Sequence, residues 1–213
     1  MKNSLIIQRV FSFITALGRN AIPLGVVLFG GNSAQSAMVL YFLETLVAII
    51  LAAIYVRLRA SAEDPGYAGI SSTRSQIITN GRVSYRSQTG NRKTLIQNFL
   101  IFSLGFSLIP GIFMIVFVSL ILHADISSAT ILAGMAGISA FQILNFIAEF
   151  FTLGALTPES ASNFLTQSMG RSAVIYISVF AGMILAAFVQ SWFIVPFAAL
   201  KTIVDVSYAF QRK

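Results

Sequence analysis

The sequence predicts an all-α fold: a polytopic membrane helical bundle of six transmembrane helices, with a short cytoplasmic β-hairpin and one interfacial amphipathic helix. Two observations lead to this prediction. The 213-residue chain is 56% hydrophobic and only 10% charged, whereas about a quarter of the residues in a soluble domain are charged. Its charge-free stretches are also long enough to cross a bilayer, which takes about 20 apolar residues. We therefore expect a single transmembrane domain over residues 1–213.

The boundaries of the spans follow from these stretches and from the turn residues that divide them. The segment Gly30-Gly31-Asn32-Ser33 has the composition of a turn. A polar pair, Gln190-Ser191, interrupts the last apolar stretch. The third span contains Pro110, where we expect a kink. The six expected spans are residues 5–28, 34–56, 95–122, 128–153, 171–189 and 192–210.

The distribution of basic residues predicts the orientation, because cytoplasmic loops collect Lys and Arg. The basic loop 58–93 and both ends of the chain carry most of the Lys and Arg, whereas the connections near Asn32, His123 and Gln190 have none. We expect a multi-pass protein of the cell (inner) membrane, with both termini in the cytoplasm. The net charge of +7 is then a consequence of topology, and the expected partner is the lipid bilayer and not nucleic acid.

Arg9 interrupts the first apolar stretch, and no signal-peptidase site follows it. The N-terminus is therefore expected to be an uncleaved helix and not a signal peptide.

Two cytoplasmic segments have their own patterns. Residues 75–86 place Asn80-Gly81 between β-prone stretches, which predicts a hairpin with a type I′ turn. Its Arg82 and Arg86 contact either anionic lipid headgroups or a partner, or they belong to a solvated basic loop. Thr157 followed by Pro158 is typical of a helix start, and apolar residues then recur at helical spacing up to Gly170. This pattern predicts a short amphipathic helix at the interface.

Charged residues inside the expected spans are the strongest candidates for a functional site. At about 1.5 Å per residue, Arg19, Glu44 and Lys201 all lie roughly 15 Å from the outer ends of their helices. Asp205 lies one turn beyond Lys201 on the same face. Charges at this depth usually face the bundle interior and have partners. We predict one network of these four residues, with Asn20 beside it.

Two interpretations of this network remain open. The charges either clamp the helices together or form a proton or ion relay or a polar substrate site. Their sum of zero favours the clamp.

Two further patterns concern helix contacts. Gln142, Asn145 and Glu149 fall on one face of the fourth span, as a polar stripe that serves either function or ordinary interhelical hydrogen bonding. Small residues spaced four apart indicate close helix packing in lipid. They are Ala129, Ala133 and Gly137 on the fourth span and Ser178, Gly182 and Ala186 on the fifth, and we expect the two faces to meet.

The chain offers little for catalysis or metal binding. It has no cysteine and a single histidine, His123, which sits beside Asp125 at the expected outer interface. No nucleophile set, zinc motif or phosphate-binding loop is present. We expect no catalytic residue, no metal and no cofactor.

Several segments resemble an uncharacterised family of small multi-pass prokaryotic membrane proteins, known only as a domain of unknown function. They are Asn20-Ala21-Ile22-Pro23-Leu24-Gly25-Val26, Leu40-Tyr41-Phe42-Leu43-Glu44 and Leu200-Lys201-Thr202-Ile203-Val204-Asp205, with a weaker similarity at Gly111-Ile112-Phe113. The resemblance implies a helical membrane domain, and its motifs include Glu44, Lys201 and Asp205. Histidines typical of the family's third and fifth helices are replaced here by Phe and Tyr176, which argues against a histidine-based cofactor site.

The expected function is that of a non-enzymatic integral membrane protein, a structural or accessory subunit of a larger membrane complex with other membrane-protein subunits as partners. The alternative is a small transporter or channel that uses the buried charge layer. A membrane enzyme ranks third, since no constellation of catalytic side chains is present.

Overall fold

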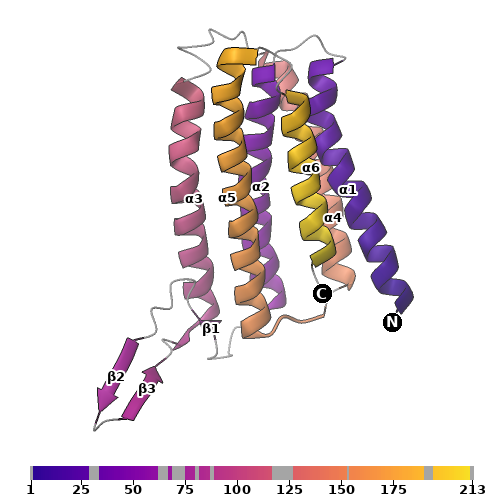
Figure 1. The fold of residues 1–213 in the computed structure, drawn as a ribbon. Helices are drawn as coiled ribbons and strands as arrows, with labels where there is room; N and C mark the ends of the chain where they lie inside the picture. Colours follow the sequence, from indigo (N-terminus) through magenta and orange to yellow (C-terminus); the bar gives the residue numbers. More distant parts are fainter. Residues whose placement is uncertain are drawn as a thin grey trace.

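The computed structural model places six helices side by side in one bundle (Figure 1). They are α1 (Lys2–Leu28), α2 (Ala34–Arg59), α3 (Arg92–Val116), α4 (Ser128–Thr152), α5 (Pro158–Val189) and α6 (Ile194–Gln211). The structure describes residues 2–28, 34–61, 67–68, 75–79, 82–86, 89–116, 127–152, 154–189 and 194–211. Side chains are described at 10–11, 13–26, 35–61, 91–114, 116, 127–151, 154–182 and 198–207.

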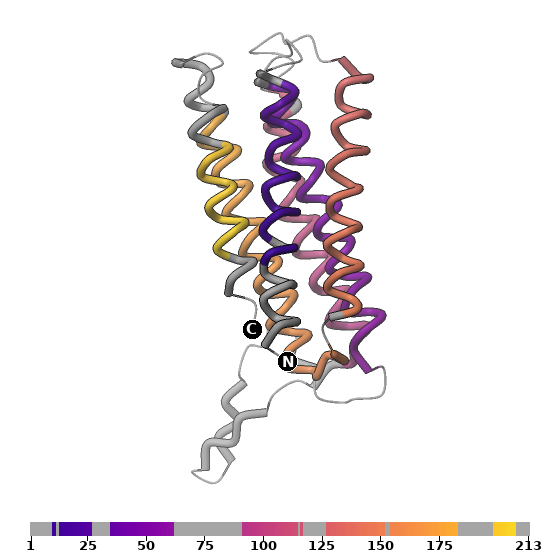
Figure 2. The backbone as a smooth tube through the Cα atoms, turned by 90° about the vertical axis from the view of Figure 1, so that its right-hand side faces the viewer, coloured from indigo at the N-terminus to yellow at the C-terminus, as the bar shows by residue number. Residues whose placement is uncertain are grey.

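Helix α2 is the centre of the bundle, because it packs against α1, α3, α4 and α5. Helix α1 lies between α4 and α6 (Figure 2). Helix α3 packs against α2 and α5 at the opposite side. Helix α1 begins and α6 ends at the same end of the bundle (Figure 1).

The core nearest this end is built from α2, α3 and the first turns of α5. Ile49, Val56, Leu95, Phe99 and Leu165 are fully buried there. Burying a Leu, Ile or Phe side chain stabilises a fold by about 1.5–3 kcal/mol in water. The start of α5 is therefore held inside the bundle by its apolar face.

The expected set of six spans is wrong. Within the described residues, three helices are long and apolar enough to cross a membrane, namely Gln35–Arg59, Arg92–Met114 and Ser128–Phe151. They belong to α2, α3 and α4. Helices α1, α5 and α6 carry Arg19, Arg171, Lys201 and Asp205, and each such charge counts about +2.5–3.5 kcal/mol against insertion at the centre of a span. The described side chains of α1 and α6, at 13–26 and 198–207, are fewer than the about 20 residues that a span needs, and those of α5 end at residue 182.

The separate interfacial helix is also wrong, because α5 runs without a break from Pro158 to Val189. The predicted start is correct: Thr157 Oγ1 accepts a hydrogen bond from the Ser160 N–H (3.2 Å). Gly170 does not end the helix, since one glycine inside a helix costs only about 1 kcal/mol relative to alanine. Buried residues recur on one face from Ala161 to Val179, so the same apolar stripe continues through Gly170.

The predicted β-hairpin does not contribute to the fold class. In the part of the chain whose side chains the structure describes, the fold is all-α. Short strands pair in the 58–93 loop: β1 (Tyr67–Ala68) with β4 (Thr89–Gly90), and β2 (Ser75–Thr79) with β3 (Arg82–Arg86). The Asn80-Gly81 turn and the side chains of Arg82 and Arg86 lie outside the described residues. Apart from β1, which contacts α3 and α5, the tertiary fold of the described residues is set by helix packing.

The two faces of small residues have different partners. Gly137 of α4 faces α1, where an added Cβ would lie 2.9 Å from Ile22 Cδ1. Helix α4 packs mainly against α1 and α2, whereas α5 packs against α2, α3 and α6. The expected meeting of the α4 and α5 faces is therefore replaced by contacts of both helices with α2. The side chain of Ala186 lies outside the described residues.

Leu165→Ala tests whether the start of α5 belongs to the core. We expect the free energy of unfolding in detergent to fall by about 2–5 kcal/mol, since a buried leucine is truncated. Gln167→Ala, at an exposed position of the same helix, is the control and should change it by less than about 0.5 kcal/mol. Equal, small effects of both changes would contradict the continuous, packed α5.

Candidate functional site: a buried charge cluster and an adjoining cavity

The ammonium group of Lys201 is the centre of the predicted charge network. Its Nζ donates to Asn20 Oδ1 (2.7 Å) and to Asp205 Oδ2 (2.9 Å). It also lies 2.9 Å from Glu44 Oε2. The side chains of Lys201, Glu44 and Asp205 are at most 1% exposed. Three helices, α1, α2 and α6, therefore meet at one cation.

Asn20 links the carboxylate of Asp205 to the backbone of α1. Its Nδ2 donates to Asp205 Oδ2 (3.0 Å) and to the Ala16 carbonyl (2.9 Å). The hydroxyl of Tyr41 donates to the Asn20 carbonyl (3.1 Å), and the Tyr41 ring lies 4.9 Å from Lys201 Nζ. Tyr41 thus covers the ammonium with a ring face that attracts cations.

Arg171 is a member of the cluster that sequence reasoning missed. Its Nε and one terminal nitrogen each lie 2.8 Å from Asp205 Oδ1, so α5 joins the network. The sequence prediction placed Arg171 at the cytoplasmic edge of a span. A continuous α5 puts it about 20 Å from the helix start, at 1.5 Å per residue. The length of α5 was the signal that could have located it.

Glu44 is held differently from Asp205. Among the described residues, neither of its carboxylate oxygens has a hydrogen-bond partner. Its contact with Lys201 is therefore an ion pair without the geometry of a hydrogen bond. Its backbone carbonyl accepts from Gln142 Nε2 (2.9 Å). This bond ties the polar stripe of α4 to the same turn of α2.

The polar stripe points toward α1 and α2 inside the bundle. Thr15 Oγ1 donates to Asn145 Oδ1 (3.1 Å). Asn145 Nδ2 donates to Glu149 Oε1 (2.8 Å). Gln142 and Glu149 are buried, at 3% and 6% exposure. The two predicted sets of polar residues are thus neighbours in the structure.

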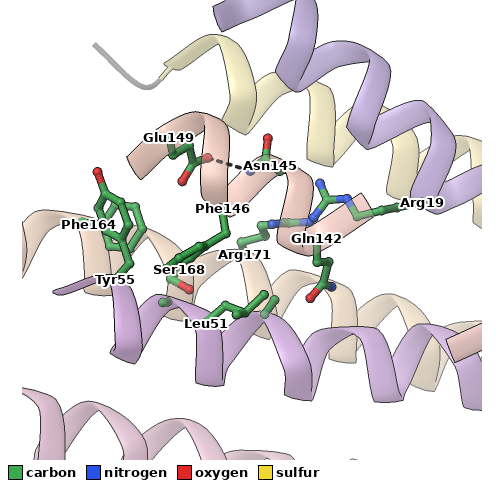
Figure 3. A pocket seen from close by; sticks show the side chains of 12 residues that line it. Arg19, Leu51, Tyr55, Gln142, Asn145, Phe146, Glu149, Phe164, Ser168 and Arg171 are labelled. Carbon is green, nitrogen blue, oxygen red and sulfur yellow. Dashed lines mark hydrogen bonds between the residues drawn. The ribbon is translucent and has the colours of Figure 1, made fainter. Parts of the chain in front are cut away.

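A cavity of about 50 Å³ joins the two sets (Figure 3). Arg19 and Arg171 contribute its positive charges, and Glu149 contributes a negative one. Its other polar lining residues are Tyr55, Gln142, Asn145 and Ser168. The remaining lining residues are apolar, namely Ala48, Leu51, Ala52, Phe146 and Phe164. Of the predicted network, Arg19 is the member that faces this cavity.

The ionisable groups of the two regions balance. Arg19, Arg171 and Lys201 oppose Glu44, Glu149 and Asp205, and all but Arg171 are at least nine-tenths buried. Their formal charges sum to zero. In the described part of the chain, no three His, Cys, Asp or Glu side chains are grouped to hold a metal. His123 lies outside the described residues. The arrangement can pair charges and hold a small polar ligand or water.

A second, apolar cavity of about 310 Å³ lies between α3 and α5. It is lined by Phe106, Ile109, Pro110, Tyr176, Ile177, Phe180 and Ala181. Hydroxyl groups of Ser107 and Tyr176 are hydrogen-bonded at 2.6 Å beside it. With so few polar groups, it suits hydrocarbon and not polar chemistry.

Asp205→Asn tests the coupling between Arg171 and Asp205. This substitution removes a charged partner of both Arg171 and Lys201, so it should lower the free energy of unfolding by about 3–5 kcal/mol. Arg171→Gln should cost about 1–3 kcal/mol less in the Asp205→Asn background than in the wild type. Chemical denaturation of the four proteins of this cycle measures both.

Arg57→Gln removes an exposed cation of α2 and is the control in both backgrounds. It should change the free energy of unfolding by less than about 0.5 kcal/mol. Strict additivity of the Arg171 and Asp205 substitutions would show that their ion pair does not contribute to stability.

Comparison with known proteins adds a family and no activity. The model of the family described as Family of unknown function (DUF6498) matches residues 5–213. No curated protein and no solved structure matches the chain. The resemblance to an uncharacterised family is confirmed, and the match spans all six helices. The chain therefore belongs to this family of unknown function.

Proposed function

We propose that the protein is a non-enzymatic, multi-pass integral membrane protein that acts as an accessory subunit of a larger membrane complex. The closed charge cluster is the observation that carries this proposal. Lys201 and Asp205 use their polar atoms on Asn20, Glu44 and Arg171. Such a cluster clamps four helices and leaves no vacant carboxylate at Asp205 for a transported ion.

The proposed location is the cell membrane, with both termini in the cytoplasm. Three helices that are long and apolar enough to span a bilayer are consistent with a membrane protein. Helix α1 begins and α6 ends at the end of the bundle where α2 ends and α3 begins (Figure 1). Arg57 and Arg59 lie in the last turn of α2, and Arg92 and Lys93 in the first turn of α3. Positive charge at this end supports the orientation, because cytoplasmic ends are basic.

An outward-facing surface of α4 supports the role of a subunit. Ala129 and Ala133 are exposed on this chain. In lipid, small residues four apart let another helix approach closely. We propose that this face receives a helix of another membrane-protein subunit.

Ala133→Trp tests the subunit proposal. A tryptophan on the close-packed face should release the protein from its complex, since the partner helix no longer fits. Native purification in a mild detergent, at natural abundance, followed by native electrophoresis and mass spectrometry measures the assembly. We expect the wild type to migrate within the complex and Ala133→Trp to migrate separately.

Ile101→Trp is the matched control for this experiment. Ile101 lies on α3, a different helix from Ala133, and is 70% exposed. This variant should remain in the complex. A wild-type protein that migrates as a lone monomer would overturn the accessory-subunit proposal.

The alternative function, a small transporter or channel that uses the buried charge layer, is favoured by the cavity beside Arg19 and Arg171. Glu44→Gln separates the two proposals. A clamp loses folded yield when Glu44 is neutralised, because Lys201 keeps one carboxylate partner instead of two. A relay keeps its yield and loses proton or ion flux in proteoliposomes.

We expect the clamp result, with a folded yield reduced several-fold. Glu159→Gln, at an exposed carboxylate of α5, should leave both yield and flux unchanged. Normal yield together with abolished flux for Glu44→Gln would support the transporter.

A further inference from the structure

The buried charges are unevenly distributed between the cluster and the cavity. Glu44 and Asp205 are the anions in contact with Lys201. Two cations, Arg19 and Arg171, face the cavity, where Glu149 is the one carboxylate among the described lining residues. The cavity therefore carries a local excess of positive charge, although the six groups together are neutral.

The two arginines occupy the same end of the cavity. Figure 3 shows their side chains pointing toward one another, while Glu149 lies toward the opposite end and accepts from Asn145 (2.8 Å). Like charges repel strongly in a protein interior, where the effective dielectric constant is far below that of water. Arg171 is partly compensated by Asp205 on its other side. Arg19 takes part in none of the salt bridges among the described residues.

Arg19 also has an unused hydrogen-bond donor in this place. The residue is 7% exposed, and its Nε has no hydrogen-bond partner among the described residues. A buried, charged donor of this kind usually binds an acceptor. Ser168 adds a hydroxyl to the same lining.

We propose that the cavity between Arg19 and Arg171 binds a small monovalent anion, of the size of chloride, bromide or nitrate. The anion accepts from both guanidinium groups and screens their repulsion. A volume of about 50 Å³ holds a few groups of the size of water. The remaining space takes a water that donates to Gln142 Oε1, a buried acceptor without a described partner. Larger organic anions such as gluconate do not fit.

The thermal stability of the purified, full-length protein tests this site. Stability is measured in detergent at constant pH and ionic strength, with sodium gluconate replaced stepwise by sodium chloride, bromide or nitrate. A bound anion stabilises the fold by mass action, so Tm should rise in a saturable manner. At ten times Kd the expected rise is about 3–6 °C for a chain of this size.

Arg19→Gln should abolish this anion-dependent rise in Tm, while Arg57→Gln should leave it intact. Bromide soaked into crystals of the wild type gives a second measurement that does not depend on how well Arg19→Gln folds, because its anomalous signal locates the ion. A peak between Arg19 and Arg171 is expected. Equal Tm in gluconate and chloride, or water only in the cavity, would overturn the proposal.

Discussion

The pairing of one buried ammonium determines much of this structure. Lys201 is fully enclosed, and an unpaired charge in an apolar interior is so costly that such a side chain must find anionic partners. Glu44 and Asp205 provide the negative charge, and Asn20 provides a neutral acceptor. This requirement constrains how α1 and α2 pack against α6, because Glu44 is the single carboxylate of α2 and Asn20 is the residue of α1 that accepts from Lys201.

Asp205 extends the same constraint to α5. Its two oxygens face different cations, with Oδ1 bound by Arg171 and Oδ2 by Lys201. The charges of this cluster lie on α2, α5 and α6, whereas α3 and α4 are among the three helices that qualify as candidate spans within the described residues. Helix α2 belongs to both groups, since it qualifies as a span and carries Glu44. It therefore joins an apolar layer to a polar one at the centre of the bundle.

The cluster and the cavity serve different physical ends. Within the cluster, short contacts between opposite charges hold helices together and leave little for a ligand to bind. In the cavity, Arg19 Nε has no hydrogen-bond partner among the described residues, and a like charge and a small volume lie beside it. Arg171 connects the cluster and the cavity, because it lines the cavity and binds Asp205 on its other side.

The sequence by itself determined that helices dominate and, to within about three residues, where α1, α2, α4 and α6 begin and end. It also located four of the buried charges, because Arg19, Glu44, Lys201 and Asp205 interrupt long apolar stretches, where only paired charges are tolerable. Periodicity located the polar stripe but not its partners, since a helical face does not specify which neighbour it meets.

Only the tertiary structure decided that α5 is one helix, that Arg171 joins Asp205, and that α4 packs on α1 and α2 and not mainly on α5. These features depend on contacts between residues far apart in the chain, such as 34 positions for Arg171 and Asp205. Local propensity at Gly170 favoured a break, but burial of Ala161 and Leu165 in the same stripe as Ser172 and Val179 outweighed it.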